Sequence, residues 1–140
     1  MKSEDFMREA IRLSRQNMSA NQGGPFGAVI VRGDKIIARG WNRVSAKNDP
    51  TAHAEIVAIR LACKKLGRFD LNDCELYASC EPCPMCLGAV YWSRLMGVYY
   101  GTTRDDAAAI HFADAFIYDE IRRPRSRRAI PLKPLLREEA

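Results

Sequence analysis

Two short clusters in the sequence carry side chains that can bind a metal ion. Residues 51–55 read Thr-Ala-His-Ala-Glu and place an imidazole, His53, two positions before a carboxylate, Glu55. Residues 82–86 read Pro-Cys-Pro-Met-Cys and carry two thiols. Two thiolates and one imidazole suit Zn²⁺, which accepts soft and borderline donors in tetrahedral sites. Because the Cys-x-x-Cys spacing alone also serves redox dithiols, the prediction of a metal depends on both clusters together.

The two clusters are expected to meet at the N-terminal ends of two helices, one over residues 51–65 and one starting at Pro84. Cys83 then lies near an N-cap and Cys86 one turn into the helix. The partial positive charge of a helix N-terminus lowers the pKa of a thiol and favours the thiolate that binds metal. We therefore predict that His53, Cys83 and Cys86 bind one zinc ion.

Glu55 has a different predicted role. On an ideal helix it points about 200° away from His53, so it is poorly placed as a fellow ligand. Three protein ligands leave one position for water, which zinc makes acidic enough to attack an electron-poor ring carbon. A nearby carboxylate can pass protons from this water to a ring nitrogen and to a departing amine. That chemistry is hydrolytic deamination, and His-x-Glu with a later Pro-Cys-x-x-Cys is the signature of zinc deaminases.

A noncatalytic zinc-binding interaction module is the alternative from another class of protein. In that case Cys80 or Cys74 completes four protein ligands. Glu55 then only interacts favourably with the helix dipole. The number of protein ligands distinguishes the two hypotheses.

The surrounding pattern predicts an α/β protein, with helices packed on a sheet. Ser3 can cap an amphipathic first helix that ends before the Gly-Gly-Pro at residues 23–25. Residues 42–49 are polar and are expected to form a loop. The predicted strands are residues 26–31, 35–39, 71–78 and 96–100, and the later helices are residues 84–92, 105–110 and 112–121.

The composition is that of one globular domain covering residues 1–140, with 47% hydrophobic and 28% charged residues. No segment reaches the roughly 18 apolar residues that a membrane span needs, and acidic residues at the N-terminus argue against a secretory signal. We therefore expect a cytoplasmic protein. The net charge of +5 includes a basic tail from about residue 122, with arginines at 122, 123, 125, 127 and 128. A solvated tail is favoured over nucleic-acid binding.

Beyond these motifs, the stretch from residue 1 to about 131 resembles the small bacterial guanine deaminases of the cytidine deaminase-like fold. The matching segments are residues 23–31, 48–55, 79–88 and 116–121. The resemblance implies a three-layer α/β/α fold with a central mixed sheet of about five strands. It further implies one zinc ion per subunit and conversion of guanine to xanthine and ammonia.

The same resemblance implies roles for four further residues. Phe26 would stack on the purine, Asn42 would hydrogen-bond its edge, and the backbone N–H of Ala54 would hold a carbonyl oxygen. Asp114 would approach the amino group and act in catalysis with Glu55. In relatives the C-terminal region can be exchanged between subunits, so a homodimer with exchanged C-terminal segments is expected.

This chain also departs from that family. The family usually reads Gly-Phe-Asp-Asp where residues 111–114 are His-Phe-Ala-Asp, so Ala113 replaces the first acidic residue. Relatives also run on to an aromatic residue that closes the pocket, whereas here the sequence ends at Ala140. Both differences bear on pocket closure and on the choice of substrate.

The tRNA adenosine deaminases are the nearest alternative family. They look similar around residues 40–43 and 49–56, and they share the zinc motif. That family usually reads Pro-Val-Gly-Ala-Val where residues 25–29 are Pro-Phe-Gly-Ala-Val, so Phe26 argues against it. Guanosine and cytosine remain as alternative substrates.

Overall fold

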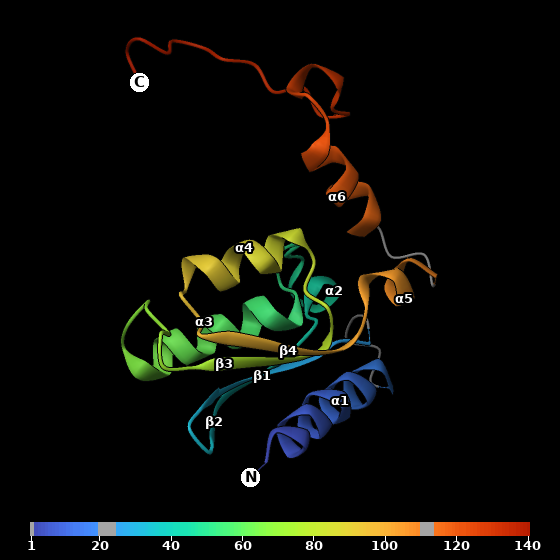
Figure 1. Cartoon of the computed structure of the whole chain (residues 1–140), viewed down its shortest axis with the longest axis vertical. Coiled ribbons are helices and arrows are strands. Elements are labelled where there is room, and N and C mark those ends of the chain that lie inside the picture. The colour runs from blue at the N-terminus through green and yellow to red at the C-terminus, as the bar shows by residue number, and fades with distance from the viewer. Residues whose placement is uncertain (1, 20–24, 110–113) are drawn as a thin grey trace.

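The computed structural model of the chain describes residues 2–19, 25–109 and 114–140 (Figure 1). None of the helices in these ranges is both long and apolar enough to cross a membrane. The elements in chain order are α1 (Ser3–Ser19), β1 (Gly27–Arg32), β2 (Lys35–Trp41), α2 (Val44–Lys47), α3 (Ala54–Leu66), β3 (Glu75–Cys80), α4 (Pro84–Trp92), β4 (Gly97–Thr102), α5 (Arg104–Ala109), α6 (Asp114–Arg122) and the 3₁₀ turn η1 (Arg125–Arg127).

The sheet is mixed and has the strand order β2-β1-β3-β4. β1 pairs antiparallel with both β2 and β3, and β3 pairs parallel with β4. The expected mixed α/β architecture is confirmed. The expectation of about five strands is wrong by one for the described residues, because the chain after β4 forms α5 and α6 and α6 leads away from the sheet (Figure 1).

Helices cover both faces of the sheet, as a three-layer fold requires. Figure 1 shows α1 on one face and α3 with α4 on the other. Alternate residues of β1 supply the two interfaces, since Val29 and Val31 pack with Phe6 of α1 whereas Ala28 and Ile30 pack with the α3 side. Burying a valine- or isoleucine-sized side chain contributes about 1.5–3 kcal/mol, so this alternation fixes which helix lies on which face.

Gly40 in β2 sets how closely α3 approaches the sheet. A Cβ added at this position would overlap the carbonyl oxygen of Ala54 and lie 2.7 Å from the backbone nitrogen of Ala58. Only glycine therefore allows the first turn of α3 to lie directly on β2. This contact places His53 and Glu55, which stand at the start of α3, over the ends of the strands.

Three local expectations are corrected by the structure. Ser3 is the first helical residue of α1 rather than its N-cap, and the Asp5 carboxylate accepts a hydrogen bond from the backbone N–H of Lys2. The loop expected at residues 42–49 contains the one-turn helix α2, which ends at Asn48 in the left-handed conformation (φ 47°). The helix expected from residue 51 begins at Ala54, because Asp49 accepts hydrogen bonds from the backbone and hydroxyl of Thr51 and holds a turn there.

Candidate active site

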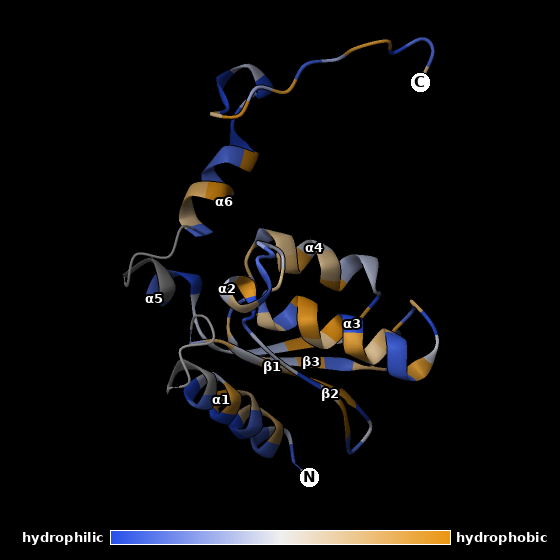
Figure 2. Ribbon diagram, turned by 180° about the vertical axis from the view of Figure 1, so that it is seen from behind, coloured by the Kyte–Doolittle hydropathy of each residue, from blue (hydrophilic) through white to orange (hydrophobic). Residues whose placement is uncertain are grey.

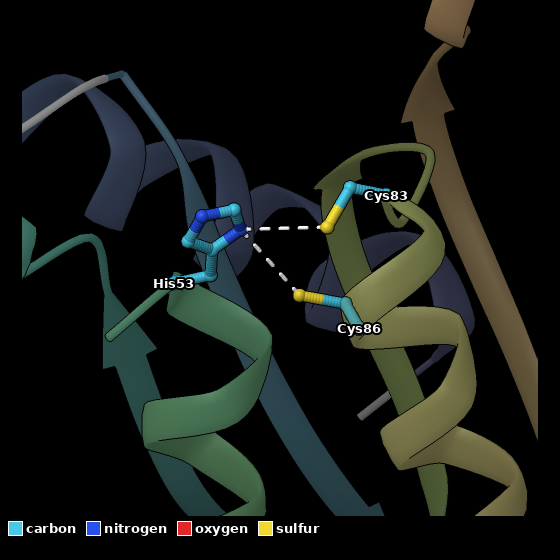
Figure 3. A group of neighbouring side chains, drawn as sticks. All are labelled: His53, Cys83 and Cys86. Carbon is cyan, nitrogen blue, oxygen red and sulfur yellow. Dashed lines mark hydrogen bonds between the residues drawn. The ribbon is translucent and has the colours of Figure 1, made fainter. Parts of the chain in front are cut away.

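The three predicted zinc ligands come together at the starts of two helices. His53 is the N-cap of α3 and Cys83 is the N-cap of α4, both with extended backbone, and Cys86 lies in the first turn of α4. The Nδ1 atom of His53 is 3.6 Å from the Sγ atom of Cys83 and 3.6 Å from that of Cys86 (Figure 3). Pro84 at the start of α4 fixes this helix end and thereby the position of both thiols.

The geometry of these donors fits a zinc ion. Tetrahedral zinc with the usual Zn–S and Zn–N bond lengths holds a nitrogen and a sulfur ligand about 3.6 Å apart. Both nitrogen–sulfur distances here have that value, and all three ligand atoms lie within 4.8 Å of one another. The imidazole and the two thiols can therefore bind one ion without rearrangement.

The two cysteines share a strong electrostatic coupling. A hydrogen bond from Cys86 and a second one from His53 lower the pKa of the Cys83 thiol to about 4. The hydrogen bond to Cys83 and burial raise the pKa of the Cys86 thiol. These contacts favour the thiolate form of Cys83, and a divalent cation favours the loss of the second proton.

No fourth cysteine joins this group within the described residues, where His53, Cys83 and Cys86 form the cluster able to hold an ion. Cys80 directs its thiol to the carbonyl oxygen of Thr103, at 3.8 Å. Cys74 precedes β3 and therefore lies at the opposite end of that strand from Cys80. The geometry accordingly leaves one side of the metal group facing a pocket.

This pocket has a cavity volume of about 80 Å³, so it has room for more than one water molecule. It brings together most of the residues singled out in the sequence, from five separate segments of the chain. Its lining residues are Phe26, Asn42, His53, Ala54, Glu55, Cys80, Glu81, Cys83 and Asp114.

Glu55 lies in the pocket wall although it is almost completely buried, with 8% of its surface exposed. Burial raises the pKa of its carboxyl group above the ordinary value, as is common for carboxyl groups at active sites. The predicted angle of about 200° between the side chains of His53 and Glu55 holds only if both residues are helical. Because His53 has extended backbone, both side chains reach the same pocket, and the site does lie across the helix end.

Asn42 and Ala54 present polar groups to the pocket in defined orientations. The Asn42 Oδ1 atom accepts a hydrogen bond from the backbone N–H of Val44 at 2.9 Å. Its amide NH₂ group remains to donate toward the pocket that Asn42 lines. Ala54 is the first residue of α3, so its N–H has no partner within the helix and can bind an acceptor.

Asp114 enters the pocket from the C-terminal region. It is the first residue of α6 and is half-buried, and burial raises the pKa of its carboxyl group. Ala113, the departure noted in the sequence, lies outside the described residues. Asp114 lines the same pocket as Glu55 and Phe26.

Glu81 is a pocket residue that sequence reasoning missed, and Cys80 was considered only as a metal ligand. Cys80 is the last residue of β3 and Glu81 follows it, where the chain turns toward Cys83. Their position between a buried strand and the first cysteine was the available signal, because residues at strand ends often line α/β sites.

Comparison with known proteins gives matches over most of the chain. Residues 1–102 match the family model for the cytidine and deoxycytidylate deaminase zinc-binding region. The guanine deaminase of Bacillus subtilis is 55% identical over 131 residues, which are 94% of this chain and 84% of that protein. A tRNA-specific adenosine deaminase of Agrobacterium fabrum is 44% identical over 86 residues, which are 61% of this chain and 57% of that one.

The solved structures agree with the sequence matches. The X-ray structure of guanine deaminase from Bacillus subtilis superposes with a TM-score of 0.96 and 53% identity, covering 99% of this chain and 89% of that one. The resemblance to bacterial guanine deaminases and the zinc-dependent character of the site are thereby confirmed. The chain belongs to the family of the cytidine and deoxycytidylate deaminase zinc-binding region.

Proposed function

We infer that this protein is a zinc-dependent guanine deaminase, which hydrolyses guanine to xanthine and ammonia. The observation that carries this inference is one pocket in which Phe26, Asn42 and Asp114 join Glu55 and the zinc-binding group. The similarity to the Bacillus subtilis guanine deaminase along 94% of the chain supports the same substrate.

The pocket offers complementary groups for a planar purine. The Phe26 ring supplies a stacking face, and the Asn42 NH₂ group donates to an acceptor on the purine edge. The Ala54 N–H binds a carbonyl oxygen, helped by the partial positive charge at the start of α3. These contacts orient the amino-bearing carbon toward His53, Cys83 and Cys86, the residues that would hold zinc.

Two carboxyl groups handle the protons of the reaction. Bound zinc supplies the Lewis acidity that makes water nucleophilic near neutral pH. Glu55 takes a proton from the attacking water and delivers it to the adjacent ring nitrogen. The second proton comes from the hydroxyl group that the water has left on the ring carbon. Asp114 passes it to the amino group as the carbon–nitrogen bond breaks, so that the carbonyl group of xanthine forms and ammonia leaves.

Turnover is tested by incubating the zinc-loaded protein with guanine and following the ultraviolet spectrum. Loss of guanine absorption with appearance of xanthine and ammonia is expected. Guanosine, cytosine and adenine are compared in parallel. A protein that converts one of these and leaves guanine unchanged would remove guanine as the substrate.

The alternative is deamination of adenosine in a tRNA anticodon loop. Exposed Arg125 and Arg127 favour it, because basic side chains can contact phosphates. Arg128 instead donates to the backbone carbonyl oxygens of Glu120 and Ile121, and Arg123 pairs with Glu120, so part of this arginine cluster stabilises the end of α6. Inosine formed in tRNA, with guanine inert, would establish this alternative.

We also propose that the protein is a homodimer with exchanged C-terminal segments. Tyr91 and Trp92 at the end of α4 are 77% and 87% exposed. Figure 2 shows hydrophobic residues on α6 and along the tail, where Leu132 and Leu135 are also exposed. Apolar surface of this kind favours association with a second copy. Light scattering during gel filtration should give twice the 15.8 kDa of one chain.

Two further expectations stay predictions. Residues 1–140 are proposed to form one deaminase domain, which limited proteolysis tests through a single protected core. The cytoplasmic location is checked by cell fractionation.

A further inference from the structure

A contact on α6 ties the C-terminal helix to the segment that carries a zinc ligand. The hydroxyl group of Tyr118 donates a hydrogen bond to the carbonyl oxygen of Pro82 at 3.1 Å, and Pro82 directly precedes Cys83. Tyr118 is half-buried, whereas Phe116 and Ile121 on the same helix are more than half exposed. The helix is thus attached to the body of the protein through its tyrosine face.

The aromatic ring of Tyr118 makes a second contact. The guanidinium carbon of Arg104 lies 4.2 Å from the centroid of the ring, within the range of a cation–π interaction. Arg104 is the first residue of α5, and its backbone N–H donates to the Glu81 Oε1 atom at 2.9 Å. We call the three residues Glu81, Arg104 and Tyr118 the clamp.

The clamp is also anchored to the sheet. The backbone N–H of Glu81 donates to the carbonyl oxygen of Thr102, the last residue of β4, at 2.8 Å. Glu81 lines the pocket as well. Four segments therefore meet at one edge of the pocket: the end of β4, the start of α5, the residues that precede Cys83, and the helix α6.

Asp114 is carried on the same helix face as Tyr118. The two residues are four positions apart in α6, so their side chains project in nearly the same direction. Tyr118 lies against Pro82 while Asp114 reaches the pocket beside Glu55. The place of the Asp114 carboxyl is thus set by where Tyr118 docks.

We propose that Tyr118 is a positioning residue for the deamination reaction, which holds the Asp114 carboxyl at the pocket through its contacts with Pro82 and Arg104. The proposal rests on the proposed function, because it assigns Asp114 to the reacting amino group. Displacement of a reacting group by about 1 Å can lower a rate about 100-fold. Tyr118 therefore contributes to turnover without touching the substrate.

The first experiment measures the docking of α6 without any substrate. Hydrogen–deuterium exchange is followed by mass spectrometry in the zinc-loaded wild type and in the Tyr118→Phe and Tyr118→Ala variants. Amides of α6 should exchange roughly tenfold faster in Tyr118→Ala, since a lost hydrogen bond and ring contact favour local opening. Tyr118→Phe keeps the ring and should show a smaller increase, and α1 and α3 should be unchanged.

The second experiment is a double-mutant cycle with Asp114→Asn. Tyr118→Phe should lower kcat/KM for guanine about three- to tenfold, as expected for one hydrogen bond. Tyr118→Ala should lower it roughly 100-fold, mainly through kcat. In the Asp114→Asn background, Tyr118→Ala should add less than about threefold, because the group that it positions is already lost.

Tyr100→Phe and Tyr100→Ala are the matched controls, because Tyr100 is an exposed tyrosine on β4 that the mechanism does not use. They should leave α6 exchange and kcat/KM as in the wild type. The proposal is overturned if hydrogen–deuterium exchange in α6 of Tyr118→Ala equals that of the wild type. It is also overturned if the losses of kcat/KM caused by Tyr118→Ala and by Asp114→Asn multiply in the double variant. If the wild-type protein leaves guanine unchanged, the proposed function fails. The hydrogen–deuterium exchange measurement then tests by itself whether Tyr118 docks α6.

Discussion

The Nδ1 atom of His53 lies 3.6 Å from the Sγ atom of Cys83, although the two residues are 30 positions apart in the chain (Figure 3). Each is the N-cap of a different helix and has extended backbone, so each side chain leaves its helix end toward the other. The metal site is thus built between two helix N-termini. Their partial positive charges favour the thiolates that bind zinc.

Replacing Cys86 by serine should remove zinc from the protein. The Cys86 thiol is completely buried in the metal group, and a neutral hydroxyl is a much poorer ligand than a thiolate. We expect zinc affinity to fall by more than about 100-fold, because even the loss of a residue that only hydrogen-bonds to a zinc ligand can lower metal affinity by up to that factor. Metal analysis after dialysis and guanine turnover measure the effect.

Cys63→Ser is the matched control for this substitution. Cys63 is half-buried in α3 and lies outside the metal group, so its variant should keep zinc and activity. Chelation of wild-type zinc should also lower the melting temperature and stop turnover, and added zinc should restore both. Full zinc content in Cys86→Ser would contradict the ligand assignment.

Glu55→Gln should separate metal binding from catalysis. The amide keeps the shape of the buried side chain but cannot carry a proton between water and substrate. Because positioned general acids and bases contribute about 10²–10⁴-fold, kcat should fall within that range while zinc content stays that of the wild type. Steady-state kinetics with metal analysis on the same sample test this. Turnover near the wild-type rate would remove Glu55 from the proton path.

The metal site was predictable from the sequence because local features determine it. Pro84 marks the start of α4, which puts Cys83 at an N-cap and Cys86 in the first turn. The short apolar run at residues 26–31 likewise predicts a strand, and the structure places β1 at Gly27–Arg32. In both cases residues close in sequence carry the information.

Features that depend on contacts between distant segments were not predictable. The docking of Tyr118 on Pro82 spans 36 positions, and the contact of Arg104 with the Tyr118 ring likewise joins two helices that the sequence pattern does not place side by side. Hydrophobic periodicity predicts α6 as a helix but does not say where it packs. The relation of His53 to Glu55 also depended on a backbone conformation that periodicity does not report.

Asn42→Asp should weaken substrate binding specifically. The carboxylate can still accept the hydrogen bond from Val44, but the NH₂ donor to the purine edge is lost and a charge faces its acceptor. An unpaired buried polar group costs about 1–3 kcal/mol, so kcat/KM for guanine should fall roughly 5- to 150-fold. Asn72→Asp, an exposed position between α3 and β3, is the control and should have wild-type kinetics. Equal kinetics for both variants would contradict the assigned contact.

Gly40→Ala should destabilise the protein and loosen the metal site. The added Cβ would overlap the Ala54 carbonyl oxygen and push α3, with His53 at its start, away from β2. Overpacking of this kind costs about 1–3 kcal/mol. Urea unfolding and zinc affinity measure the effect. Gly88→Ala is the control, because a Cβ there meets nothing within 4 Å and alanine raises helix stability by up to about 1 kcal/mol.

The stability contributed by Glu9 should depend on pH. Its carboxylate accepts hydrogen bonds from Arg12 at 2.7 Å and from Arg39 of β2 at 2.9 Å, which lower its pKa to about 2. Since the folded-state pKa lies below the ordinary value of 4.5, the unfolded chain takes up this proton first as the pH falls. The stabilisation is therefore present above pH 4.5 and lost as the pH falls through about 2.

Glu9→Gln should accordingly lower the free energy of unfolding by about 1 kcal/mol at pH 7, the upper range for ion pairs with exposed arginines. The difference between wild type and variant should shrink as the pH falls from 5 toward 2. Loss of zinc at low pH affects both proteins alike and cancels in this difference. Glu4→Gln, at an exposed pair with Arg8, should change stability little at any pH. A Glu9→Gln difference that stays constant down to pH 2 would show that the contacts of Glu9 act through packing rather than charge.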